Sequence, residues 1–275
     1  MRASLTPCLV FAAAALIGAC GGTTGSDTFL FEAAAGGVER DPSQPFAFDE
    51  TDGRGRAWHV VLTRALLTVG PVYLNNAVLV SQAQETSCFR HGGRYVGEVL
   101  STLQVDALSP ALTFFPSAGR GVADQVRTAE VWLFGDESNL DGTTPILDVA
   151  GTATSELGTF PFEGTVALTK DWLRPADPSS PGQNQLCEIR QATNIPAEFH
   201  TAYGGGLIVR IEPSRWFDKF DFSELKPAIS AGSDAGPGNV VYVLGKSPSD
   251  DFTTRILVEN LRARTGVYSL QWVSP

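Results

Sequence analysis

Basic residues are scarce in this chain of 275 residues, which has 20 Lys and Arg against 30 Asp and Glu and a formal net charge of −10. A protein that binds nucleic acid neutralises phosphates with a basic surface, so the acidic balance argues against that class of function. Hydrophobic residues make up 43% of the chain, which is enough for a sizeable core and argues against wholesale disorder. With 28 Gly and 17 Pro, the composition favours a turn-rich fold over a helical bundle.

The standard catalytic signatures are also missing. The sequence contains no G-x-S-x-G nucleophile elbow, no H-E-x-x-H motif, no P-loop and no C-x-x-C pair. The strip His91-Gly92-Gly93 is similar to the oxyanion strip of esterases, but no elbow serine accompanies it. We therefore predict that the protein is not an enzyme, and a hydrolase with a scattered active site is the weaker alternative.

Apart from the N-terminus, the chain has no hydrophobic run long enough to span a membrane. Leu9–Ile17 is apolar and follows Arg2, but it is shorter than the roughly 20 residues of a spanning helix and is typical of a signal peptide. It ends in Ile17-Gly18-Ala19-Cys20, which resembles a bacterial lipobox. We expect residues 1–19 to be a lipoprotein signal peptide and Cys20 to be lipidated. An ordinary signal peptide cut nearby is the alternative.

Cysteine and methionine are rare, with 4 Cys and 1 Met in the whole chain. Removal of the signal peptide would take Met1 and Cys8, and lipidation would use Cys20. Cys88 and Cys187 would then remain as an even pair in an oxidising compartment, so we expect a disulfide between them. Two buried free thiols are the alternative.

We divide the mature chain into two parts. Residues 20–44 are assigned to the lipidated cysteine and a flexible tether, which begins with the Gly-, Ser- and Thr-rich Gly21–Ser26, and residues 45–275 to one β-rich globular domain. Apolar and polar residues alternate in 160–168 and 268–272, as in half-buried strands. Further strands are predicted at 58–63, 65–74, 95–105, 126–134, 144–153, 207–211 and 240–244. The pattern predicts an all-β fold, a single antiparallel β-sandwich-like domain.

Two C-terminal segments depart from this alternation. In Pro213–Leu225, Trp216, Phe217 and Phe220 fall on one helical side, which predicts one short helix or capping loop near 213–225 packed on the sheet. Residues 255–264 fit two structures, a strand joined by a turn to the last strand or a helix.

Three histidines, His59, His91 and His200, are candidate metal ligands. Imidazole suits copper or zinc, and methionine ligation is impossible once Met1 is removed. The glycines after His91 allow close approach of the backbone to a ligand, and Glu98 is the carboxylate that we add to any such site. Ordinary surface histidines are the alternative, since none is spaced from another as in a ligand motif. Trp58, Val60 and Leu62 are expected to face the core, so His59 would point to solvent.

The lipobox, the tether, the alternating β pattern, the widely spaced cysteines and the segment Trp216–Phe222 together resemble periplasmic β-sandwich lipoproteins. In the segments near 58–74 and 207–225 the chain is similar to the copper-binding partner lipoproteins encoded at methanobactin-type loci. That resemblance implies a metal-binding sandwich that uses histidines and works with a partner oxidase, and it assigns no individual ligand.

These observations lead to one expectation about function. The protein is predicted to be an envelope-anchored periplasmic lipoprotein that binds a ligand or a protein partner, with copper or zinc as the candidate cofactor. A structural or assembly lipoprotein is the alternative. Gly21 stands where an aspartate would favour inner-membrane retention, so the outer membrane is the expected location, with the domain facing the periplasm or the cell surface. The membrane is contacted through the lipid on Cys20.

Overall fold

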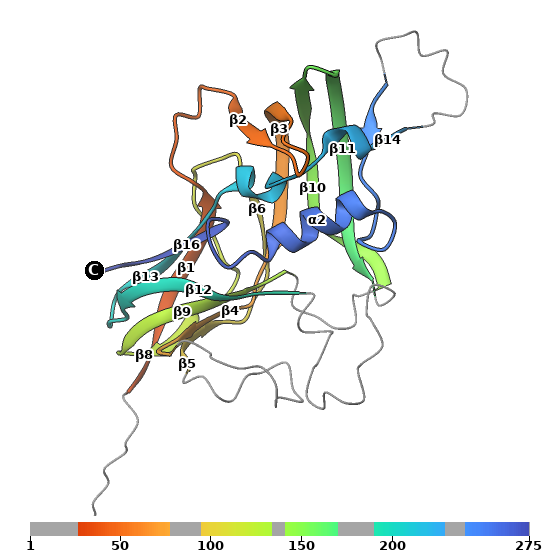
Figure 1. The fold of residues 1–275 in the computed structure, drawn as a ribbon. Helices are drawn as coiled ribbons and strands as arrows, with labels where there is room; N and C mark the ends of the chain where they lie inside the picture. The colour runs from red at the N-terminus through yellow and green to blue at the C-terminus, as the bar shows by residue number, and fades with distance from the viewer. Residues whose placement is uncertain (1–26, 78–94, 134–140, 170–189, 229–239, 275) are drawn as a thin grey trace, which may run out of the picture.

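The computed structural model describes residues 27–77, 95–133, 141–169, 190–228 and 240–274. Within these residues the chain forms two β-sheets, one α-helix and two short 3-10 helices (Figure 1). The larger sheet contains β1 (Thr28–Gly37), β4 (Val72–Asn75), β5 (Tyr95–Val99), β7 (Thr113–Phe114), β8 (Gly119–Val122), β9 (Gln125–Trp132), β12 (Gln191–His200), β13 (Gly206–Ile211) and β16 (Tyr268–Val273). The smaller sheet contains β2 (Phe46–Thr51), β3 (Ala57–Val69), β6 (Leu103–Asp106), β10 (Asp141–Ser155), β11 (Gly158–Thr169), β14 (Lys226–Pro227) and β15 (Tyr242–Val243).

The larger sheet curls until it is nearly a closed barrel. Its strands follow the order β12-β9-β4-β5-β8-β1-β13-β16, and β7 pairs with β1. The two end strands approach each other where Phe199 of β12 stacks on Trp272 of β16, with ring centroids 6.3 Å apart. The smaller sheet follows the order β14-β15-β11-β10-β3-β2, with β6 paired to β3.

The predicted all-β, β-sandwich-like fold is confirmed, with one correction to the strand directions. Both sheets are mixed rather than purely antiparallel, because β1 pairs in parallel with β13 and β11 pairs in parallel with β15. The expected faces of β3 are correct: Trp58, Val60 and Leu62 are buried, whereas the His59 side chain is 58% exposed.

Strand β1 lies in the middle of the larger sheet, between β8 and β13. The folded part therefore begins at Thr28, and residues 28–44, which the sequence analysis gave to the tether, belong to the fold. The ring of Phe31 on β1 packs against Gly119 of β8, where a Cβ would lie only 2.3 Å from the ring. Glycine at position 119 therefore leaves the space that the Phe31 ring occupies.

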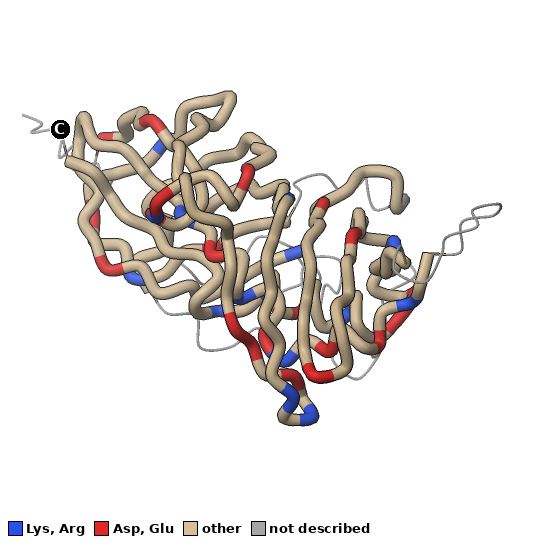
Figure 2. Tube along the Cα trace, turned by 90° about the horizontal axis from the view of Figure 1, so that it is seen from above, with Lys and Arg blue, Asp and Glu red and all other residues tan. Residues whose placement is uncertain are grey.

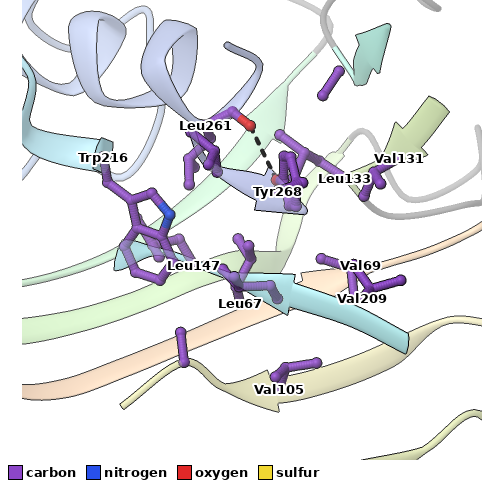
Figure 3. Packing of buried hydrophobic residues seen from close by; sticks show 14 of the residues in the cluster. Leu67, Val69, Val105, Val131, Leu133, Leu147, Val209, Trp216, Leu261 and Tyr268 are labelled. Carbon is purple, nitrogen blue, oxygen red and sulfur yellow. Dashed lines mark hydrogen bonds between the residues drawn. The ribbon is translucent and has the colours of Figure 1, made fainter. Parts of the chain in front are cut away.

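The core lies between the two sheets. Figure 3 shows Leu67 of β3 and Leu147 of β10 in the same cluster as Val209 of β13 and Tyr268 of β16, so both sheets contribute to one interior. The hydroxyl of Tyr268 donates to the carbonyl of Leu261 at 3.0 Å. Complete burial raises the pKa of Tyr268 far above its ordinary value, so this donor stays protonated.

The C-terminal segments resolve as helical elements. Pro213–Phe217 and Phe222–Glu224 are 3-10 helices (η3 and η4), and Trp216, Phe217 and Phe220 are fully buried, as the prediction for 213–225 expected. Phe252–Leu261 is the α-helix α2, which begins with Asp251 accepting from the Thr254 amide at 2.6 Å. The strand interpretation of 255–264 is therefore wrong, because this N-cap and the buried face of the helix outweigh the turn signal that follows. No helix within the described ranges is long and apolar enough to cross a membrane.

Acidic and basic residues are interspersed over both sheets (Figure 2). Asp52 and Glu130 are the carboxylates that are buried within the described part of the chain. Asp52 lies in the turn between β2 and β3, and its side chain has no exposed surface. It accepts from the amides of Arg54 and Arg56 at 2.9 Å each and from Nε1 of Trp58 at 3.0 Å. Burial acts to raise the pKa of Asp52, but these hydrogen bonds and the Arg56 guanidinium outweigh it and leave the pKa below its ordinary value of 3.8.

We predict that Asp52→Asn lowers the free energy of unfolding at pH 7 by about 1–3 kcal/mol, because a buried set of donors loses its charged acceptor. The lowered pKa means that the ionised carboxylate stabilises the fold above pH 3.8, and that this contribution is lost as the pH falls through the folded-state value. The gap between wild type and variant should therefore shrink below about pH 4 in urea unfolding. Asp49→Asn is the control, since the Asp49 side chain is 85% exposed. An equal loss in both variants would contradict this role.

Candidate functional site

Four of the residues selected from the sequence lie outside the described residues. These are Cys20, Cys88, His91 and Cys187. Lipidation of Cys20, the disulfide and the participation of His91 in a metal site therefore remain predictions.

The other three selected residues lie on three different strands. His59 is on β3 of the smaller sheet, where its Nδ1 lies 2.7 Å from Oδ1 of Asp49. Glu98 is on β5 and His200 on β12 of the larger sheet, and two strands lie between them. They are also offset along the strands, because Glu98 is level with Glu130 of β9 and His200 pairs with Gln125, five residues away. Among the residues that the structure describes, no group of three or more His, Cys, Asp or Glu side chains is arranged to bind a metal ion.

Glu98 belongs instead to a row of side chains across the outer face of the larger sheet. The register places Leu30 opposite Arg120, Arg120 opposite Glu98, Glu98 opposite Tyr73, and Tyr73 opposite Glu130. Opposite residues in neighbouring strands point to the same face. Nη2 of Arg120 donates to Oε1 of Glu98 at 3.0 Å.

The far end of this row is aromatic and buried, away from the main core. The Tyr73 ring lies 5.3 Å from that of Tyr95 and 5.9 Å from that of Trp132. The Arg190 guanidinium lies 5.0 Å from the centre of the Trp132 ring, a cation–π contact. Tyr73, Trp132, Glu130 and Arg190 are each at most 3% exposed. We call the following set the outer-face cluster: Tyr73, Asn75, Tyr95, Glu98, Glu130, Trp132 and Arg190.

The electrostatics of the cluster act on Tyr73. Burial raises the pKa of its hydroxyl well above the ordinary value of 10.0, and the carboxylates of Glu98 and Glu130 and the neighbouring Tyr95 add to the rise. Tyr73 is therefore a neutral phenol throughout the physiological range. A neutral hydroxyl between two carboxylates can donate one hydrogen bond and accept others, which suits recognition of a polar ligand.

Asn75 contributes a buried side-chain amide to the cluster. Asn75 is 1% exposed, and neither its Oδ1 nor its Nδ2 has a hydrogen-bond partner within the described part of the chain. It lies opposite Thr128 in the register that also pairs Tyr73 with Glu130, so it shares their face. A buried amide without partners costs about 1–3 kcal/mol, which a bound polar group would recover.

Sequence reasoning found one residue of the cluster, Glu98, and selected it because of its closeness to His91. Glu130 carried a signal that was not used, since it is a lone carboxylate inside the apolar strand 126–134. Asn75 carried a weaker one, as a polar residue directly after Val72-Tyr73-Leu74. The aromatic members carried none, because aromatic residues in β-proteins usually belong to the core.

We predict that Tyr73→Phe weakens the loss of stability at alkaline pH. With a raised folded-state pKa, the neutral phenol stabilises the fold below pH 10.0 and this contribution is lost as the pH rises through the folded-state value. Urea unfolding above about pH 10 should show the variant losing up to about 1.4 kcal/mol less per pH unit than wild type. Tyr203→Phe, at a residue 81% exposed, is the matched control. Identical slopes for wild type and Tyr73→Phe would contradict the burial of this hydroxyl.

Comparisons of the chain with protein-family models, with curated proteins and with solved structures found no match.

Proposed function

We propose that the protein is an outer-membrane lipoprotein, anchored by lipid on Cys20, whose outer-face cluster binds a ligand or a partner protein in the envelope. The lipobox at Ile17–Cys20 supports the anchor. The fold supports a tether as well, because strand β1 begins at Thr28, eight residues after Cys20. The domain would face the periplasm or the cell surface.

The observation that carries the binding role is the buried Asn75 amide. It lies on the same face as two carboxylates, Glu98 and Glu130, and the neutral phenol of Tyr73. Polar groups that converge beside aromatic rings are what small-molecule sites use to orient a ligand. The main core between the sheets has its own apolar packing, so the cluster is not needed to fill it.

The predicted disulfide is compatible with the strand ends. Cys88 precedes Tyr95 by seven residues and Cys187 precedes Arg190 by three. Seven and three residues of extended chain reach at most about 25 Å and 11 Å. Tyr95 and Arg190 are joined through Tyr73 and Trp132 by successive contacts of 5.0 to 5.9 Å. The two cysteines can therefore meet beside the cluster, where their bond would stabilise the segments next to it.

The metal proposal depends on His91. His59 is excluded from a site with Glu98 because the two lie on different sheets, and the Glu98 carboxylate is paired with Arg120 at 3.0 Å. A copper or zinc site would therefore need His91, four residues before Tyr95, with Glu98 as an oxygen ligand after it leaves Arg120. The same cluster without a metal would bind an organic ligand or a partner.

Anchoring is tested by Cys20→Ser in a bacterial host. Because the thiol is the site of lipid attachment, the variant should carry no acyl chains and should move from the membrane fraction to the soluble fraction, whereas wild type should stay with the membrane. Mass spectrometry of the N-terminal peptide is the second measurement. An N-terminal peptide without lipid in the wild type would contradict the proposal.

The ligand is tested by titrating the protein with cupric and zinc ions at neutral pH in a calorimeter. If the metal proposal is correct, His91→Ala should weaken binding at least about tenfold, since one ligand is lost. Binding should also weaken below about pH 6, where imidazole is protonated. His59→Ala is the matched control and should bind as wild type does. Equal binding by His91→Ala removes His91 from the site, and an absence of binding in all three leaves the organic ligand or partner.

A further inference from the structure

Next to strand β1 the larger sheet has an apolar groove. It has a volume of about 490 Å³ and is lined by parts of β1, β7, β13 and β16 together with Leu112, Gly204 and Gly205. The outer face of β1 forms its floor, and Phe114 of β7 lies opposite Ala34 of that strand. Strands β1, β13 and β16 follow one another in the sheet and lie on the side of the molecule that carries the C-terminus (Figure 1).

The groove is formed by hydrophobic side chains that point to solvent. Leu30 is 70% exposed, Phe114 61%, Val273 47% and Leu112 37%. Tyr203 adjoins the glycines of the groove and is 81% exposed. Exposed apolar residues on soluble proteins are usually scattered singly. A contiguous set of them is typical of a surface that contacts a membrane, a ligand or another protein.

Charge distinguishes this surface from the rest of the protein. The chain has a formal net charge of −10, yet among the described residues that line the groove Glu32 is the one with an ionisable side chain. A basic partner or an anionic lipid would not be selected by such a surface. An uncharged apolar interface suits it, and Tyr203 at the edge combines an apolar ring with a polar hydroxyl, as residues at a membrane–water interface do.

The position of the groove along the chain indicates what covers it. Thr28 follows Cys20 by eight residues and Leu30 by ten. Ten extended residues span at most about 36 Å, and the tether is shorter when it is not fully extended. A lipid on Cys20 would therefore keep the groove within reach of the bilayer, because the tether enters the fold at β1, whose outer face forms the floor of the groove.

We propose that this groove rests on the lipid bilayer, with Leu30 and Phe114 inserted at the interface of a zwitterionic phospholipid surface. The inference rests on the proposed anchor at Cys20. The anchor supplies attachment, and the groove adds a second contact that sets the orientation of the domain. The outer-face cluster begins two strands away at Glu98, so this orientation places the binding site beside the membrane.

The test uses the full lipidated protein in phosphatidylcholine vesicles that contain brominated acyl chains, which quench nearby tryptophan. Phe114→Trp reports on the groove. Leu157→Trp is the matched control, because Leu157 is 54% exposed but lies between β10 and β11 of the smaller sheet. The native tryptophans give the same background in both variants. Flotation of the vesicles measures anchoring separately.

We expect both variants to float with the vesicles, and the added tryptophan at 114 to be quenched by at least about twofold more than that at 157. Flotation with equal quenching, or with none at 114, would overturn the groove inference and leave the anchor intact. Failure to float would show that the proposed anchor is wrong, and the inference would fall with it. If the protein is a dimer in detergent and the tryptophan at 114 is not quenched, a second copy of the chain covers the groove. That result would also overturn the inference that the groove contacts the bilayer.

Discussion

The position of strand β1 is the constraint on which the rest of the structure depends. Its first half pairs with β8 and its second half with β13, so it joins the two parts of the curled sheet. Phe29 and Phe31 point inward and contact Trp272 of the end strand β16, which in turn stacks on Phe199 of the other end strand. Its outward residues, Leu30 foremost, form the floor of the apolar groove. One strand thus joins the two parts of the sheet, contributes Phe29 and Phe31 to the core and presents the apolar surface that follows the predicted anchor in the sequence.

Much of the fold could be predicted from local pattern. Residues 160–168 and 268–272 alternate strongly, and both are strands. Strand β1 was missed because Ala33–Gly37 consists of small residues, which give little contrast between a buried and an exposed face although the strand is central. Strand β12 was missed because Pro196 and Asn194, with a φ of 55°, are typical of turns. Long-range pairing with β9 outweighs those local preferences.

The candidate site could be predicted less well, because it depends on register. Tyr73, Glu98 and Glu130 are far apart in the sequence and become neighbours only through the pairing of β4 with both β5 and β9. No spacing rule in a single sequence connects them. The histidines were conspicuous as residue types, yet His59 and His200 project from different sheets. The histidines therefore led the sequence analysis to predict a metal site. The pairing of the strands instead brings together the polar and aromatic residues of the outer-face cluster.

If Cys20 carries the proposed lipid, the short tether would place the barrel-like sheet against the membrane. Neutron reflectometry of the lipidated protein on a supported phosphatidylcholine bilayer measures this directly, because it gives the height of the protein layer above the lipid headgroups. Because the fold begins at Thr28, eight residues after Cys20, the domain can lie at most about 29 Å from the lipidated cysteine. If the groove contacts the bilayer, we expect a dense protein layer that begins at the headgroups. A dense layer separated from the headgroups by a hydrated gap would contradict contact between the groove and the bilayer.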